Sequence, residues 1–155
     1  MTANVVMGRL PALAVLAALL LVALLLGGPY VIRHRIRSNE AAALVSLRKI
    51  IAIENAHMER YNTFGAICDR SSSNVRNDTW EQMQIHAVIE EAQKHDYQLE
   101  FRNCSQVAYS IVANPLHSGP IAPHTFCSDQ TAVIHFAPSP STCDGSNPIW
   151  TDTRP

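Results

Sequence analysis

Cysteine is the residue type with the clearest chemical meaning in this chain of 155 residues. Four cysteines are dispersed through it, without a CxxC pair and without the Cys/His spacing of a zinc site: Cys68, Cys104, Cys127 and Cys143. An even number of dispersed cysteines is typical of disulfide bonds, which persist in oxidising compartments. We therefore predict two disulfides, and the spacing leaves all three possible pairings open.

Histidines and acidic residues do not indicate a catalytic or metal site. The seven histidines include no His-x-x-x-His or His-Glu-x-x-His spacing, and Asp144 is the only acid in its Asp-Gly-Ser-Asn segment, whereas a calcium loop needs several. Disulfide-bonded cysteines do not act as nucleophiles, and no acid–base pair suited to catalysis can be identified. We predict a non-enzymatic chain that needs no metal and no cofactor.

The elements that must position these residues begin with a strongly apolar segment. Residues 10–32 contain no Asp, Glu, Lys, Arg or His, and about 20 such residues in a helix span roughly 30 Å, the thickness of the hydrocarbon core. This Leu/Ala run is longer than the core of a typical signal peptide. We predict a short N-terminal flank at 1–9 and a transmembrane helix at 10–32.

Helical periodicity continues beyond the apolar segment. Apolar residues recur at steps of three and four, and no glycine lies between Pro29 and Phe64. This pattern predicts one long helix that reaches about Asn62, with a membrane half followed by an amphipathic half. We expect Pro29 to bend this helix rather than to end it.

A second, short helix and several strands complete the predicted fold. Asp78 or Thr79 can cap a helix that ends near His95. Beyond it the apolar period becomes two, which predicts short antiparallel strands near 97–102, 107–112, 125–127 and 132–136. The order indicates an α+β fold in which the long helix packs on a small antiparallel sheet. We assign 33–136 to this globular domain and 137–155 to an irregular C-terminal tail.

The charge balance gives no general attraction to nucleic acid. Beyond Ile32, 11 basic residues stand against 13 acidic ones, which leaves a net charge of −2.

The side of the membrane on which the globular domain lies is not fixed by these residues. Arg33, Arg35 and Arg37 follow the apolar segment and favour the cytoplasm by the positive-inside rule, whereas the predicted disulfides favour an oxidising compartment.

Two blocks of the sequence resemble the type IV pilins and the type II secretion pseudopilins. Residues 28–50 contain a proline, an arginine-rich turn, Asn39-Glu40-Ala41 and a later Ser-Leu-Arg step. Residues 109–136 are similar to the family's strand, proline-containing loop, Asp-Gln turn and last strand. The chain departs from the family at its start: Ala12 stands where the membrane glutamate is expected, and Gly8 is followed by Arg9 and Pro11 rather than by a clear prepilin cleavage motif.

The resemblance implies a subunit that works by assembly. It would be a pilin-like or pseudopilin-like protein of a type IV pilus or type II secretion system, with a single pass through the inner (plasma) membrane and a periplasmic domain. Its partners would be membrane lipid and other pilin-like subunits, with no nucleic acid. The residues expected at helix packing, at the bend and at contacts between subunits are Leu13, Leu16, Leu20, Pro29, Glu40 and Arg48.

The resemblance also implies a disulfide pairing. Pilin-like domains often carry a C-terminal bridge, which here would join Cys127 to Cys143 and leave Cys68 to bond with Cys104. Two other readings stay open. The chain could be a lone membrane-anchored extracytoplasmic binding domain that does not polymerise, or a domain that faces the cytoplasm with four free thiols.

Overall fold

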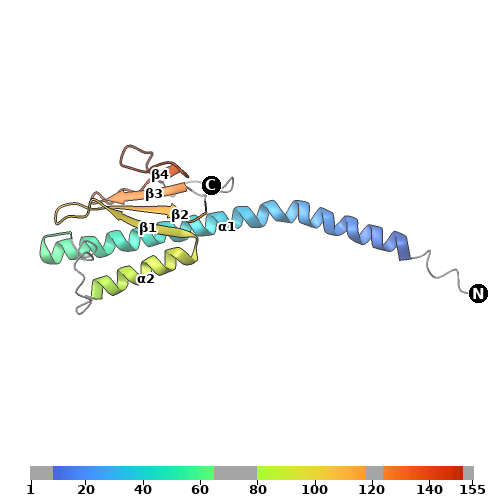
Figure 1. Ribbon diagram of the computed structural model, residues 1–155, viewed down its shortest axis with the longest axis horizontal. Helices are drawn as coiled ribbons and strands as arrows, with labels where there is room; N and C mark the ends of the chain where they lie inside the picture. The colour runs from blue at the N-terminus through green and yellow to red at the C-terminus, as the bar shows by residue number, and fades with distance from the viewer. Residues whose placement is uncertain (1–8, 65–79, 118–123, 152–155) are drawn as a thin grey trace, which may run out of the picture. The chain divides into compact units, whose positions relative to one another are not determined.

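The computed structural model describes residues 9–64, 80–117 and 124–151 (Figure 1), and within helix α1 it leaves out the side chains of residues 9–13, 23–27 and 29. The chain forms two compact units, Met1–Arg35 and Ile36–Pro155. The described elements are helices α1 (Arg9–Tyr61) and α2 (Trp80–Lys94) and strands β1 (Tyr97–Arg102), β2 (Ser110–Pro115), β3 (His124–Asp129) and β4 (His135–Pro138). The predicted α+β class, with a long N-terminal helix and a small antiparallel sheet, is confirmed.

Helix α1 is a single helix of 53 residues that passes through Pro29. It ends at the position that the sequence predicts, because Asn62 adopts a left-handed conformation (φ 58°) and its backbone N–H donates to the Met58 carbonyl at 2.8 Å. Asparagine tolerates this conformation better than most residues do. Among the described residues, no helix combines the length and the apolar character that a membrane crossing requires.

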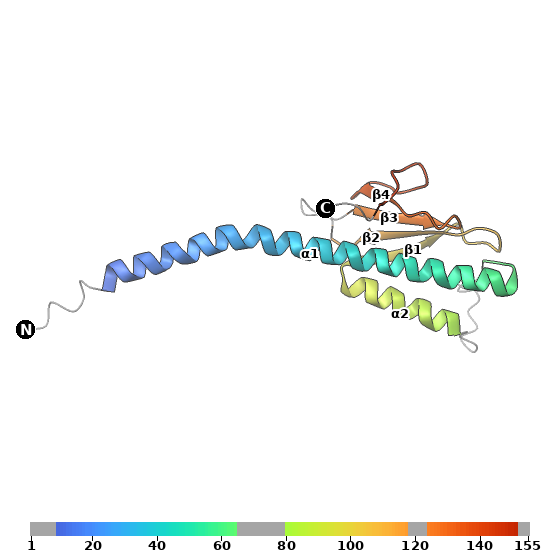
Figure 2. The ribbon, with the colours of Figure 1, turned by 180° about the vertical axis from the view of Figure 1, so that it is seen from behind.

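The second unit is built around an antiparallel sheet with the strand order β1-β2-β3-β4. Neighbouring strands pair in sequence order, as the partners Leu99↔Ala113 and Phe126↔Phe136 illustrate. In both views of the second unit, α1 lies along the sheet and α2 runs beside α1 and next to β1 (Figures 1 and 2).

One face of the sheet packs against the helices. In each strand, alternate residues point to this face, as period-two geometry requires. The buried core joins these residues to α1 and α2; its largest members include Leu47, Ile50, Ile85, Tyr97, Tyr109, Ile111 and Phe126. The amphipathic half of α1 is therefore the main cover of the sheet.

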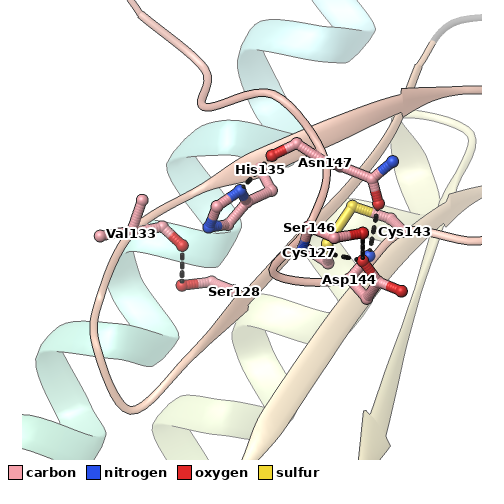
Figure 3. Close-up of a disulfide and its surroundings, with 8 residues drawn as sticks. All are labelled: Cys127, Ser128, Val133, His135, Cys143, Asp144, Ser146 and Asn147. Atoms are coloured by element: carbon pink, nitrogen blue, oxygen red, sulfur yellow. Dashed lines mark hydrogen bonds between the residues drawn. A yellow bond between two sulfur atoms is a disulfide. The ribbon is translucent and has the colours of Figure 1, made fainter.

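The opposite face of the sheet is closed by a disulfide instead of a helix. The residues between the core-facing ones form a second, smaller buried cluster of Val112, Cys127, Ala137 and Cys143. Cys127 and Cys143 are bonded, which holds the loop after β4 against this face (Figure 3). A sheet of four short strands thus receives cover on both sides.

Two strands begin three residues later than predicted, and turn chemistry explains both shifts. Three strands also end later than predicted: β2 at Pro115, β3 at Asp129 and β4 at Pro138. The second strand begins at Ser110 rather than at Val107, because Ser105 closes a turn: its Oγ accepts from the Ala108 N–H at 3.1 Å and its N–H donates to the Ala108 carbonyl at 2.8 Å. Val107 is 78% exposed in this turn. The alternation of apolar residues therefore begins one turn before the actual strand.

The last strand begins at His135 rather than at Ala132, because the preceding turn is longer than expected. Asp129 Oδ1 accepts hydrogen bonds from the backbone and hydroxyl of Thr131, and the Ala132 N–H donates to the Asp129 carbonyl at 2.9 Å. Ala132 adopts a left-handed conformation (φ 63°), which ends the turn and delays the strand.

Most described residues of the C-terminal tail lack regular structure, but the last of them pair with the sheet. Ile149 forms an isolated antiparallel bridge with His135, and the Trp150 N–H donates to the Ile134 carbonyl at 2.8 Å. The Trp150 ring packs edge-on against Phe126 and Phe136 at 5.1 and 5.5 Å between centroids. This part of the predicted tail belongs to the folded domain.

Candidate functional site

The first candidate site is the apolar surface of α1 in the first unit. Nine consecutive side chains, at residues 14–22, are all exposed, and every one is Ala, Val or Leu. Nine residues make two and a half helical turns, so this apolar surface has no polar side. Among the residues predicted for helix packing, Leu16 and Leu20 are 61% and 58% exposed, whereas the side chains of Leu13 and Pro29 lie outside the described residues.

This apolar surface ends at a group of aromatic and basic side chains. Tyr30 is 73% exposed, and its ring lies 6.5 Å from that of His34 one turn later. Arg33, His34 and Arg35 are also exposed. Three consecutive helical residues are spread over about 200° of the helix circumference, so these basic groups cover more than one face of the helix.

Glu40, predicted as a contact between subunits, has a partner within its own chain. Its Oε1 atom accepts from the backbone N–H of His124 at 3.0 Å and lies 2.8 Å from His124 Nδ1. The carboxylate is 13% exposed. Glu40 therefore links the start of the amphipathic half of α1 to the first residue of β3. Its predicted role as a contact between subunits stays a prediction.

The tie at His124 extends into the core. The Tyr97 hydroxyl donates to the His124 carbonyl at 2.8 Å, and the His124 ring packs edge-on against Phe136 at 5.3 Å. Burial raises the pKa of the Tyr97 hydroxyl far above its ordinary value, and the carboxylate of Glu40 adds to this increase. The arrangement holds a protonated Tyr97 in place.

Arg48, the other predicted contact residue, lies on the exposed side of the same helix. It borders an open, mostly apolar groove of about 420 Å³ between α1 and the end of the chain, with Ile51, Val133 and Ile149 among the lining residues. Arg48 interacts within its own chain. Its position leaves the guanidinium at the edge of the groove, and its predicted assembly role stays a prediction.

The second candidate site is the loop closed by the disulfide. A groove of about 280 Å³ runs along it, bordered by Arg102, Asp129, His135 and Asp144. Asp144 Oδ1 accepts from the Ser146 N–H at 2.9 Å and from its hydroxyl at 2.6 Å, and the Asn147 side chain accepts from the Asp144 N–H (Figure 3). The two hydrogen bonds from Ser146 lower the pKa of the Asp144 carboxyl.

The geometry of this loop is that of a turn. Asp144 Oδ1 is already occupied by two donors, which is the pattern of an Asx turn. Within residues 9–64, 80–117 and 124–151, no three His, Cys, Asp or Glu residues gather as a metal-binding group. The predictions that the chain uses no metal and no cofactor stay predictions.

Three of the four cysteines can be followed in the structure. The predicted bond between Cys127 and Cys143 is confirmed, with Cα atoms 5.7 Å apart. Cys104 is also disulfide-bonded. Its expected partner, Cys68, lies outside the described residues.

Glu54 is an acidic residue on the core face of α1 that sequence reasoning missed. Its side chain is completely buried, and its carboxylate helps to raise the pKa of Tyr109, whose burial is the main cause. A signal was available, because Glu54 lies seven residues after Leu47 and four after Ile50, on the same helical face. The partnership of Glu40 with His124 had no such signal, since 84 residues separate the two.

Comparison with known proteins does not assign the chain to a family. No family model, no curated protein and no solved structure matches it.

Proposed function

We propose that this chain is a non-enzymatic pilin-like or pseudopilin-like subunit that is anchored in a membrane by the first half of α1 and associates through it with other such subunits. The observation that carries the proposal is the uninterrupted apolar surface at residues 14–22, exposed on all sides of the helix. Exposed apolar area of this kind favours burial in lipid or against other helices.

Three further features support the proposal. Residues 10–32 lack charged side chains over about 35 Å of helix, enough for a bilayer core. Small residues that permit close approach of helices occur along this stretch, such as Ala14, Ala17 and Ala18. The second unit places the amphipathic half of α1 on a four-stranded sheet, which is the arrangement that the resemblance to pilins implies.

The disulfides bear on the side of the membrane. Cys127 is bonded to Cys143, and Cys104 is bonded as well, which suits an oxidising compartment outside the cytoplasm. We therefore place the folded domain on the extracytoplasmic side. Mass spectrometry after alkylation tests this placement in cells: protection of all four cysteines is expected, and four free thiols would contradict it.

The association is tested by photo-crosslinking of the full chain in its native membrane. A photoreactive amino acid at Leu16 or Leu20 should give crosslinks to a second, differently tagged copy or to pilin-like subunits expressed with it. The same amino acid at Val107, which is 78% exposed on the folded domain, is the matched control. Crosslinks to lipid alone from Leu16 and Leu20 would support the alternative, a membrane-anchored binding domain that does not polymerise.

A further inference from the structure

The basic and aromatic residues at the end of the apolar surface form what we call the collar: Tyr30, Arg33, His34 and Arg35. All four side chains are exposed, and they occupy about 8 Å of helix length at 1.5 Å per residue. Exposed Val31 and Ile32 lie between Tyr30 and the basic residues of the collar. A change from apolar to basic surface within one and a half turns marks a boundary between two environments.

The first unit holds no acidic residue that could balance the charges of the collar, because no Asp or Glu occurs before Glu40. The arginines of the second unit differ in this respect, since Arg60 and Arg102 contact Glu81 and Glu100. A partner of opposite charge is therefore the chemistry that this surface fits. Guanidinium groups bind phosphate particularly well, because their donors match its oxygens.

The distribution of the basic groups favours a lipid surface over a protein partner. Arg33, His34 and Arg35 point in three directions around one level of the helix, and a single protein partner covers only one side. A bilayer surface surrounds an inserted helix at one level, where phosphate groups are available on every side. Tyrosine is enriched at the same depth of membrane proteins, which fits the place of Tyr30.

We propose that the collar binds the phosphate groups of anionic phospholipids and thereby sets the depth of α1 in the membrane. This inference rests on the proposed membrane anchoring and adds a lipid preference to it. Each arginine near an anionic surface strengthens binding roughly five-fold at low salt. Screening shortens the reach of this attraction to about 10 Å at 0.1 M salt, so the preference should weaken as salt is added.

The test measures lipid binding to the purified full chain in neutral detergent by native mass spectrometry. Phosphatidylglycerol should bind more tightly than phosphatidylcholine, and the double variant Arg33→Gln/Arg35→Gln should lose this preference, with little change in its affinity for phosphatidylcholine. Lys49→Gln/Arg60→Gln removes the same charge from the same helix and is the matched control. Equal affinity of the two double variants for phosphatidylglycerol would overturn the proposal.

Two further experiments distinguish a failure of the collar proposal from a failure of the proposed membrane anchoring. Added salt should release phosphatidylglycerol, because screening weakens the attraction, and sodium phosphate should release it at least as well as sodium chloride of equal ionic strength, because inorganic phosphate competes for the same guanidinium groups. Binding of phosphatidylglycerol that neither salt weakens would overturn the assignment to the collar. Flotation with pure phosphatidylcholine vesicles after a carbonate wash reports on the anchor itself. Retention of the chain without any preference for phosphatidylglycerol would overturn the collar alone, whereas loss of the chain from the vesicles would overturn the proposed anchoring as well.

Discussion

Helix α1 carries similar apolar residues in two stretches whose surroundings are opposite. Leu16, Leu19 and Leu20 are 58–65% exposed, whereas Leu44, Leu47 and Ile50 are at most 5% exposed. The first stretch is apolar at every position, and the second alternates buried positions with exposed ones such as Arg48 and Lys49. A periodic apolar stripe can be buried against one surface of its own chain. A uniformly apolar helix needs an apolar environment on all sides.

The difference between the two stretches should be clearest when one leucine in each of them is replaced by alanine. Leu47→Ala removes a fully buried side chain from the core and should lower the free energy of unfolding of the domain by about 2–5 kcal/mol. Leu20→Ala should leave that quantity unchanged within about 0.5 kcal/mol, because Leu20 has no part in the core. Denaturant titration in neutral detergent, followed by tryptophan fluorescence, measures both.

Leu20→Ala should instead act on association. In this variant, a photoreactive amino acid at Leu16 should give fewer crosslinks to other subunits, while the folded domain stays intact. An equal loss of domain stability in both variants would mean that the exposed stretch packs on the folded domain, which contradicts the contrast between the two halves of α1.

Removal of the disulfide is expected to have the next largest effect on the stability of the folded domain. The face of the sheet opposite α1 is closed by the loop that Cys127 and Cys143 hold. The double variant Cys127→Ala/Cys143→Ala opens a loop with a sequence separation of 16 and should cost about 3 kcal/mol of domain stability.

The same denaturant titration measures this loss, and the intact protein with and without a reducing agent is the control. The midpoint of the wild type should fall on reduction, and that of the variant should change less. Equal midpoints for wild type and variant would mean that the loop stays in place without its bond.

The contrast between the two stretches was largely predictable from sequence, because it depends on local periodicity. The single long helix, its end at Asn62, helix α2 and the first strand all follow from the spacing of apolar residues. The predicted caps of α2, Asp78 or Thr79, lie outside the described residues. The late starts of β2 and β4 did not, since the side chains of Ser105 and Asp129 compete locally with the strand pattern. Spacing also left open the bond of Cys127 to Cys143.

Contacts between distant parts of the chain were the least predictable. Glu40 has the sequence context of an exposed helical residue, and only the fold brings His124 to it. The residues predicted for assembly therefore separate into two kinds. Leu16 and Leu20 remain exposed and available, whereas Glu40 already serves the folded domain.

Replacement of Glu40 sharpens this separation. Glu40→Ala removes the acceptor of the His124 backbone N–H and should cost about 2 kcal/mol of domain stability. Glu59→Ala, at an exposed position of the same helix, should change it by less than about 0.5 kcal/mol. Thermal and denaturant unfolding measure the difference, and unchanged stability of Glu40→Ala together with lost association would restore Glu40 as a contact between subunits.

The smallest effect at neutral pH is expected at Tyr109, next to the buried half of α1. Its ring packs on Phe64 at 5.3 Å, and its hydroxyl is buried without a hydrogen-bond partner among the described residues. Tyr109→Phe should therefore change stability by less than about 0.5 kcal/mol near pH 7. Tyr97→Phe should cost more there, because it removes the hydrogen bond to the His124 carbonyl.

At high pH the order of the effects should change. Burial, with the carboxylates of Glu54 and Asp129, raises the pKa of Tyr109 in the folded state, so the folded state keeps a proton that the unfolded chain releases above about pH 10. Stability from this source is complete below that pH and is lost as the pH rises further. Tyr109→Phe should thus lose less stability than the wild type between about pH 9 and pH 11, and parallel curves would show that the buried hydroxyl does not drive alkaline unfolding.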